Sequence, residues 1–200
     1  AVYSQSIENQ SINYLLDLGI FKFVNLRYQK DSIDGKAILH RNFYLTPSLN
    51  QDFGVELEAS SERSNFLGSS IGLNYTHRNL FNGAEQLKTG LSIGAETQAG
   101  GGGPFINTLE ANANVGLTIP RLWLPFKVAH RLKSVIPKTL INLSGTYQQR
   151  NTLFTSGSFH TELGYKWKQN KNFQHQFYPT QFTLLRLLNT SDEFDQELLE

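Results

Sequence analysis

The residues whose spacing comes closest to a catalytic motif are Gly68, Ser70 and Gly72, which match the G-x-S-x-G pattern of a serine nucleophile elbow. That chemistry requires the serine on a sharp turn between a strand and a helix. Here the neighbouring residues alternate between polar and apolar types, and no helical pattern follows them. We therefore interpret Ser70 as a small polar residue on one face of a strand.

The run of four glycines at 100–103 suggests a phosphate-binding loop. Such a loop needs a following helix N-terminus with Lys-Ser/Thr, or the G-x-G-x-x-G spacing. Pro104, Phe105 and another strand pattern follow instead. The sequence favours a flexible loop at this position.

The five histidines do not have the spacing of metal ligands. No two of them are four residues apart on a predicted helix, and His160 and His175 have opposite parity on neighbouring predicted strands. Glu56 and Glu58 share one face of a strand and could form a glycosidase-like carboxylate pair, but nothing else in the sequence supports that chemistry. We predict no enzyme activity, no metal site and no cofactor.

Composition excludes several further classes of protein. The 200 residues carry a net charge of +1 without a basic cluster, which gives no electrostatic case for nucleic-acid binding. The absence of Cys excludes disulfides and thiolate zinc sites. No run of 18 apolar residues exists, which excludes a spanning helix but not a spanning barrel. Because the chain contains no Met, we expect it to begin at a processed or truncated end.

The first 47 residues have a different pattern from the rest. Apolar residues at helical spacing predict a helix over 6–18, ended by Gly19. Residues 20–29 and 37–45 read as strands, joined by a polar turn at 30–36 that contains Asp-Gly. This helix plus hairpin is too small to hold a core comfortably by itself.

From residue 53 onward the hydrophobic period is two, which predicts a series of β-strands. The alternating segments are 53–59, 67–77, 87–97, 109–119, 141–148, 159–168 and, less regularly around Pro179, 173–188. Eleven residues tilted at ~45° span roughly 25 Å, the height of the apolar band of an outer-membrane barrel. The polar positions are mostly Gly, Ser, Asn, Thr and Gln, as in a wet barrel interior. The alternative is a soluble β-sandwich with one solvated face.

Aromatic residues lie near the ends of alternate predicted strands. In an up-and-down sheet these ends all fall on one side, where aromatic rings would mark a membrane interface. The residues predicted to form this belt are Phe81, Trp123, Phe126 and Trp167.

Two stretches of the sequence carry a resemblance to a known family. SIENQSINYLLDLGIFKFVNLRY resembles the second helix and following strand of a POTRA repeat. LTPSLNQDFGVELEASSERSNFLGSSIGLNYTHRNLFNGAEQLKTGLSIGAETQ resembles the entry into a β-barrel, with RNLFNGAEQL at 78–87 as its most specific piece. Together with PRLWLPF and IPKT, these stretches are similar to the BamA/TamA-type outer-membrane assembly family, in its TamL-like branch.

The resemblance implies a mostly β chain in two parts. Residues 1–47 would be the C-terminal part of a periplasmic POTRA (α+β) repeat, and residues 48–200 the N-terminal part of an antiparallel transmembrane β-barrel. The family barrel has sixteen strands and an Arg-Gly-Phe-type loop motif, whereas this chain has about seven predicted strands and lacks that motif. The sequence is therefore interpreted as a fragment of a Gram-negative outer-membrane protein.

The function implied by the resemblance is non-enzymatic insertion or translocation of other outer-membrane proteins. Its implied partners are outer-membrane lipid, client outer-membrane proteins and possible accessory assembly subunits. The lateral-gate strand, at which a client strand would pair, consists of Phe53, Gly54, Val55, Glu56, Leu57, Glu58 and Ala59. The family-motif turn consists of Arg78, Asn79, Leu80, Phe81, Gly83 and Glu85.

Alternatives remain open at three points. The chain could instead form a passive porin or substrate transporter, or an outer-membrane enzyme, although no reactive cluster supports the enzyme. Arg78 and Asn79 could make a functional contact or simply stabilise their own turn. The acidic tail 191–200 could recognise a partner or form a solvated loop.

Overall fold

The computed structural model describes residues 4–33, 36–63, 66–98, 106–124, 137–150, 153–168 and 173–191. One helix is followed by strands in two antiparallel sheets, so the expectation of a mostly β chain is confirmed. The elements are α1 (Gln5–Asp17), β1 (Phe21–Ile33), β2 (Lys36–Pro47), β3 (Gln51–Arg63), β4 (Phe66–His77), β5 (Gln86–Gln98), β6 (Ile106–Ile119), β7 (Lys138–Arg150), β8 (Phe154–Lys168) and β9 (Gln174–Thr190).

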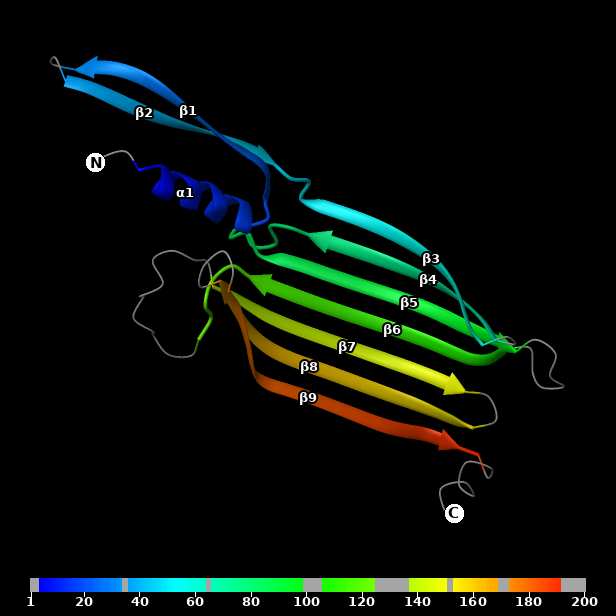
Figure 1. Cartoon of the computed structure of the whole chain (residues 1–200). Helices are drawn as coiled ribbons and strands as arrows, with labels where there is room; N and C mark the ends of the chain where they lie inside the picture. The colour runs from blue at the N-terminus through cyan, green and yellow to red at the C-terminus, as the bar shows by residue number, and fades with distance from the viewer. Residues whose placement is uncertain are drawn as a thin grey trace.

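The N-terminal part is the helix α1 beside the β1–β2 hairpin (Figure 1). Gly19 ends the helix segment with a φ of 76°, a left-handed conformation that glycine adopts at little cost. The Tyr28 hydroxyl on β1 donates to the Glu8 carboxylate on α1. The polar turn predicted at 30–36 is shorter than expected, because β1 and β2 continue to pair as far as Ile33 and Lys36.

Strands β3 to β9 form one seven-stranded sheet in sequence order, and every neighbouring pair is antiparallel. All seven strands predicted from the period-two pattern are therefore present. The register pairs Leu57 with Ile71, Ile71 with Ile93, and Ile93 with Ala111. Odd-numbered residues of β3 to β8 thus share one face of the sheet, called here the apolar face, and even-numbered residues share the polar face.

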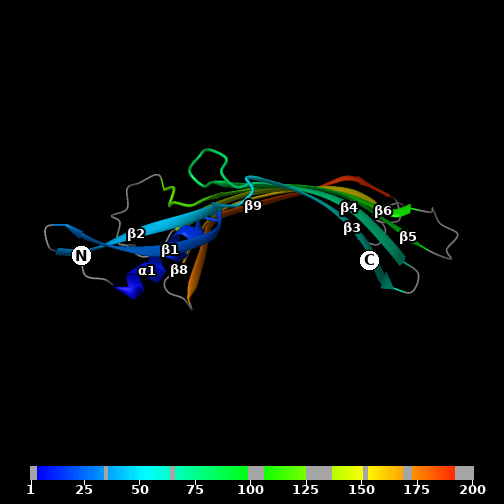
Figure 2. The same ribbon diagram turned by 90° about the horizontal axis from the view of Figure 1, so that it is seen from above.

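The apolar face is exposed rather than packed into a core. Leu57, Leu91 and Ile93 are 79%, 60% and 58% exposed. Buried apolar residues among those described are few, namely Ala84, Ile119 and Tyr165. Figure 2 shows the sheet bent into an arch, with the β1–β2 hairpin extending beyond the end of the sheet. Within the described ranges, no second sheet packs against the large one, which is not the arrangement of a β-sandwich.

The β8–β9 pair contains an irregularity that explains the weak alternation near Pro179. The register shifts between Leu163 and Tyr165, so β9 carries one extra residue there. A Cβ atom at Gly164 would lie 2.5 Å from Tyr178 Cε1, so this bulge places the Tyr178 ring where only glycine leaves room. Beyond the bulge the parity of β9 reverses, and Phe177 and Phe182 therefore lie on the same apolar face.

No helix in the described part of the chain is both long enough and apolar enough to cross a membrane.

Candidate functional site

The predicted gate residues 53–59 lie in β3, at the edge of the large sheet (Figure 1). Among the described residues, β3 pairs only with β4, so one side of its backbone has no neighbouring strand. Phe53, Val55 and Leu57 on its apolar face are 76%, 66% and 79% exposed. Gly54, Glu56 and Glu58 occupy its polar face. An exposed strand edge with apolar side chains is a template for pairing with another chain.

Arg78 fixes the segment that leads into β3. Its backbone N–H donates to Asn50 O at 2.8 Å, and its guanidinium donates to Leu49 O at 3.0 Å. The same guanidinium lies 3.4 Å from the Asp52 carboxylate. The turn after β4 therefore holds the start of the edge strand through three contacts from one residue.

Asn79 stabilises the turn itself. Its side-chain oxygen accepts the Ala84 N–H at 2.9 Å, and its backbone carbonyl accepts the Asn82 N–H at 3.5 Å. Asn82 and Ala84 both have positive φ angles, 63° and 62°, and Ala84 is buried. Asn79 thus stabilises its own turn, whereas Arg78 holds the segment that leads into β3. A functional contact from either residue to a partner stays a hypothesis.

Glu85 is the most unexpected member of the predicted turn, because its carboxylate is only 4% exposed. It accepts the Gly83 N–H at 2.9 Å and lies 3.8 Å from the Arg121 guanidinium. Its backbone carbonyl accepts the Leu80 N–H at 3.0 Å. A Cβ atom at Gly83 would lie 2.4 Å from the Glu85 carboxylate, which explains the glycine at this position.

A junction, formed by Asp17, Lys138, Lys168, Gln86 and Leu18, attaches α1 to the large sheet. Lys138 donates to the Asp17 carbonyl at 2.7 Å, and Lys168 binds the Asp17 carboxylate at 2.9 Å. Gln86 donates to the Leu18 carbonyl at 3.3 Å. The two lysines place positive charge at the negative end of the helix dipole. The helix-hairpin part is therefore held at the end of the sheet where β3 begins, called here the near end.

The predicted aromatic belt lies at the near end, where β4, β6 and β8 finish (Figure 1). Phe81 and Trp123 are 67% and 61% exposed. Trp167 stacks on His175 of β9, with ring centroids 5.3 Å apart. Phe126 lies outside the described residues. The three described aromatics therefore lie at one end of the sheet, and their role at a membrane interface stays a prediction.

The other candidates from the sequence take the positions expected of structural residues. Ser70 lies on the polar face within β4, opposite Glu58. Glu56 shares that face with Glu58, whereas His160 and His175 lie on opposite faces. In the described ranges, no group of three or more His, Cys, Asp or Glu residues could hold a metal ion.

Sequence reasoning did not find the junction or the buried carboxylate. Asp17 and Lys138 are 121 residues apart, and no local pattern relates them. Glu85 follows Asn82-Gly83 in a polar stretch, where a solvated side chain is the usual expectation. The one sequence feature that pointed to the junction was the predicted end of the helix near Asp17, because the last backbone carbonyls of a helix need hydrogen-bond donors from elsewhere.

Comparison with known proteins identifies no relative. No family model, curated protein or solved structure matches the chain. What can be said of function therefore depends on the geometry described above and on the resemblance of the sequence.

Proposed function

We propose that this chain belongs to an outer-membrane β-barrel protein that inserts or translocates other outer-membrane proteins, without making or breaking a covalent bond. Residues 1–47 are the C-terminal part of a periplasmic POTRA repeat, and residues 48–200 are the first strands of the barrel. The observation that carries the proposal is the edge strand β3, which has an open backbone edge and an exposed apolar face.

The apolar face supports a location in lipid. Its large side chains are more exposed than an aqueous core would permit, and the polar face carries small and polar residues. In a barrel the same alternation places apolar residues against lipid and polar residues in the interior. The aromatic side chains at the near end match the level of a membrane interface.

The open edge supports the action on clients. A client strand that adds to β3 pairs its backbone groups before it enters lipid, where each unsatisfied group would cost several kcal/mol. The Arg78 contacts hold the start of β3, and the short segment 48–50 connects β2 of the helix-hairpin part directly to β3. A client arriving along that part reaches the edge strand first.

The test uses the natural absence of Cys, which makes an introduced thiol unique. Glu56→Cys on β3 is compared with Asn114→Cys on β6, a central strand on the same face. The client is an unfolded outer-membrane barrel protein carrying one Cys in its terminal strand. We expect a disulfide with the cysteine at 56 and none with that at 114, because cross-strand Cβ atoms lie within disulfide range. Equal cross-linking at both positions, or none at either, rejects the proposal.

A proline pair separates strand pairing from mere proximity. In an antiparallel edge strand, the N–H groups of successive residues point to opposite sides. Of the two variants Val55→Pro and Glu56→Pro, one therefore removes a hydrogen bond to β4, and the other removes a free N–H donor at the open edge. We expect one variant to lose stability, and the other to keep its stability but lose client cross-linking through a cysteine at 58. If neither variant reduces cross-linking, pairing with β3 is not the mechanism.

A passive porin is the second candidate, favoured by the polar face of the arch. It predicts a closed barrel with steady ion conductance in planar bilayers, no need for residues 1–47, and no client cross-linking at β3. Conductance without client cross-linking would favour the porin.

A further inference from the structure

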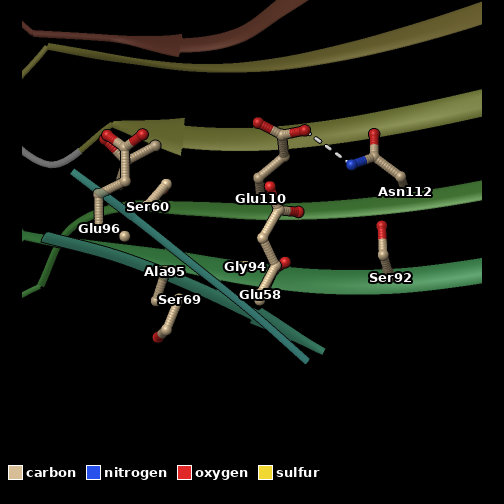
Figure 3. A pocket seen from close by; sticks show the side chains of 12 residues that line it. Glu58, Ser60, Ser69, Ser92, Gly94, Ala95, Glu96, Glu110 and Asn112 are labelled. Atoms are coloured by element: carbon tan, nitrogen blue, oxygen red, sulfur yellow. Dashed lines mark hydrogen bonds between the residues drawn. The ribbon is translucent and has the colours of Figure 1, made fainter. Parts of the chain in front are cut away.

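The polar face contains a hollow of about 260 Å³, called here the acidic hollow, away from the near end and formed by β3, β4, β5 and β6 (Figure 3). Three carboxylates from three strands line it, namely those of Glu58, Glu96 and Glu110. The sequence pointed only to the Glu56 and Glu58 pair; Glu96 and Glu110 join Glu58 through the register of the sheet.

Small residues create the space between these carboxylates. The register places Glu58 opposite Ser70, Ser70 opposite Gly94, and Gly94 opposite Glu110. With strands ~4.8 Å apart, two small residues therefore separate two glutamates over roughly 14 Å. Two residues further along the strands, Gly68 of β4 lies opposite Glu96 of β5 and again leaves space beside a glutamate. The result is a trough with acidic walls and a floor of glycine and serine.

The three carboxylates have no cationic partner in the described part of the chain. Glu110 accepts one hydrogen bond, from the Asn112 amide at 2.7 Å, and Figure 3 shows these two side chains side by side. Arg150 lies opposite Thr108 in the register of β7 but forms no ion pair with another described residue. The hollow therefore concentrates negative charge, and such a concave acidic surface attracts cations.

Thr108 provides a second, independent observation. It lines the hollow, is only 4% exposed, and its hydroxyl has no hydrogen-bond partner among the described residues. A buried hydroxyl without a partner is unfavourable, and native structures contain few of them. A ligand in the hollow that carries N–H groups would supply the missing partner.

We propose that the acidic hollow binds a flexible cation with more than one ammonium group. Each ammonium offers three donors, and ionised carboxylates only accept, so the two are complementary. The volume exceeds the ~30 Å³ share of one water several-fold, which leaves room for a chain of ammonium groups. A bare metal ion does not fit the described groups, because no cluster of three metal-ligating side chains is close enough.

Two sources share this chemistry, a free linear polyamine and the lysine side chains of a polypeptide inside the barrel. The hollow shares Glu58 with the proposed gate strand, but its other two carboxylates, Glu96 and Glu110, lie on β5 and β6 and it opens on the polar face. Cation binding there therefore does not require the proposed assembly function. A failure of client cross-linking at β3 would not contradict cation binding in the acidic hollow. A failure of cation binding would not contradict client pairing at β3.

The test is isothermal titration calorimetry, which measures the dissociation constants of spermidine and, separately, of trilysine for the full chain in detergent micelles. The perturbing variant combines Glu58→Gln, Glu96→Gln and Glu110→Gln. Glu56→Gln is the matched control, because Glu56 shares the strand and face of Glu58 but does not line the hollow. We expect the triple variant to weaken binding about 30-fold and the control less than about twofold.

Thr108→Val separates a ligand contact from a structural role. We expect it to weaken binding about threefold while leaving the unfolding midpoint unchanged or higher, because it removes an unpartnered buried hydroxyl. Spermidine binding alone identifies a polyamine site, and trilysine binding alone identifies a lysine side-chain site. The proposal is overturned if neither ligand binds at millimolar concentration, if Glu56→Gln weakens binding as much as the triple variant, or if Thr108→Val leaves binding unchanged.

Discussion

Replacing Leu91 by arginine tests whether the apolar face of the large sheet lies against lipid. Leu91 is the sixth residue of the thirteen-residue strand β5, and it pairs with Leu73 on one side and Ala113 on the other. It therefore lies close to the middle of the sheet along the strand direction. Its side chain is 60% exposed, so an arginine has room to be accommodated without displacing a packed core.

The magnitude differs between the two environments. In water, the substitution loses at most the buried 40% of the leucine, about 1 kcal/mol. Against lipid, an arginine near the bilayer midplane costs about 2–4 kcal/mol. With an m-value of about 1–3 kcal/mol/M, that cost lowers the urea midpoint by about 0.7–4 M.

The assay is equilibrium urea unfolding of the full chain in phosphatidylcholine bilayers, followed by tryptophan fluorescence. Ser92→Arg, the adjacent residue on the polar face, is the first control and should change stability by less than about 1 kcal/mol. Leu87→Arg, on the apolar face at the near end, is a depth control with an expected cost of about 0–1 kcal/mol. If Leu91→Arg costs no more than these two variants, the apolar face does not lie in lipid.

Two further predictions concern the contacts that hold the edge strand and the N-terminal part in place. Asn79→Ala should lower the free energy of unfolding by about 1–3 kcal/mol, because the buried Ala84 N–H loses its acceptor. Asn79→Asp should stay near wild type, because it keeps an acceptor oxygen. Thermal unfolding of the two variants measures this difference. A double-mutant cycle of Asp17→Asn and Lys168→Met should give a coupling free energy of about 0.2–1 kcal/mol. This coupling should decrease at high salt, because both side chains are partly exposed. A coupling that salt does not change would contradict a solvent-screened ion pair.

The strands could be predicted from the sequence because their signal is local. Alternation within each segment depends only on the residue type at every second position, and antiparallel pairing of sequential strands follows from short connections. The parity reversal in β9 was not predicted, since it arises when Tyr178 moves into the space above Gly164 on another strand. Glu85 was not recognised as buried for the same kind of reason, because its partners include Arg121 from the segment after β6.

For the candidate site too, local features could be predicted from the sequence, whereas features that depend on strand pairing could not. The gate strand could be located from its alternation, but its position at an edge depends on the pairing of the whole sheet. The grouping of Glu58, Glu96 and Glu110 required the register of four strands, which sequence periodicity does not fix.

The exposed apolar face and the open edge of β3 together constrain the surroundings of this sheet. Ala84, Ile119 and Tyr165 are the buried apolar residues in the described part of the chain, so burial within that part offsets little of the ~1–2 kcal/mol of backbone entropy lost per residue. Lipid removes that difficulty but introduces another, since unpaired edge groups cost several kcal/mol each in hydrocarbon. In lipid, the outer sides of β3 and β9 would therefore each need a neighbouring strand. A reversible partner at β3 is what the proposed insertion mechanism requires. If the proposed location in lipid is correct, the affinity of that edge for a client strand, relative to its affinity for a permanent neighbour, distinguishes an insertase from a passive pore.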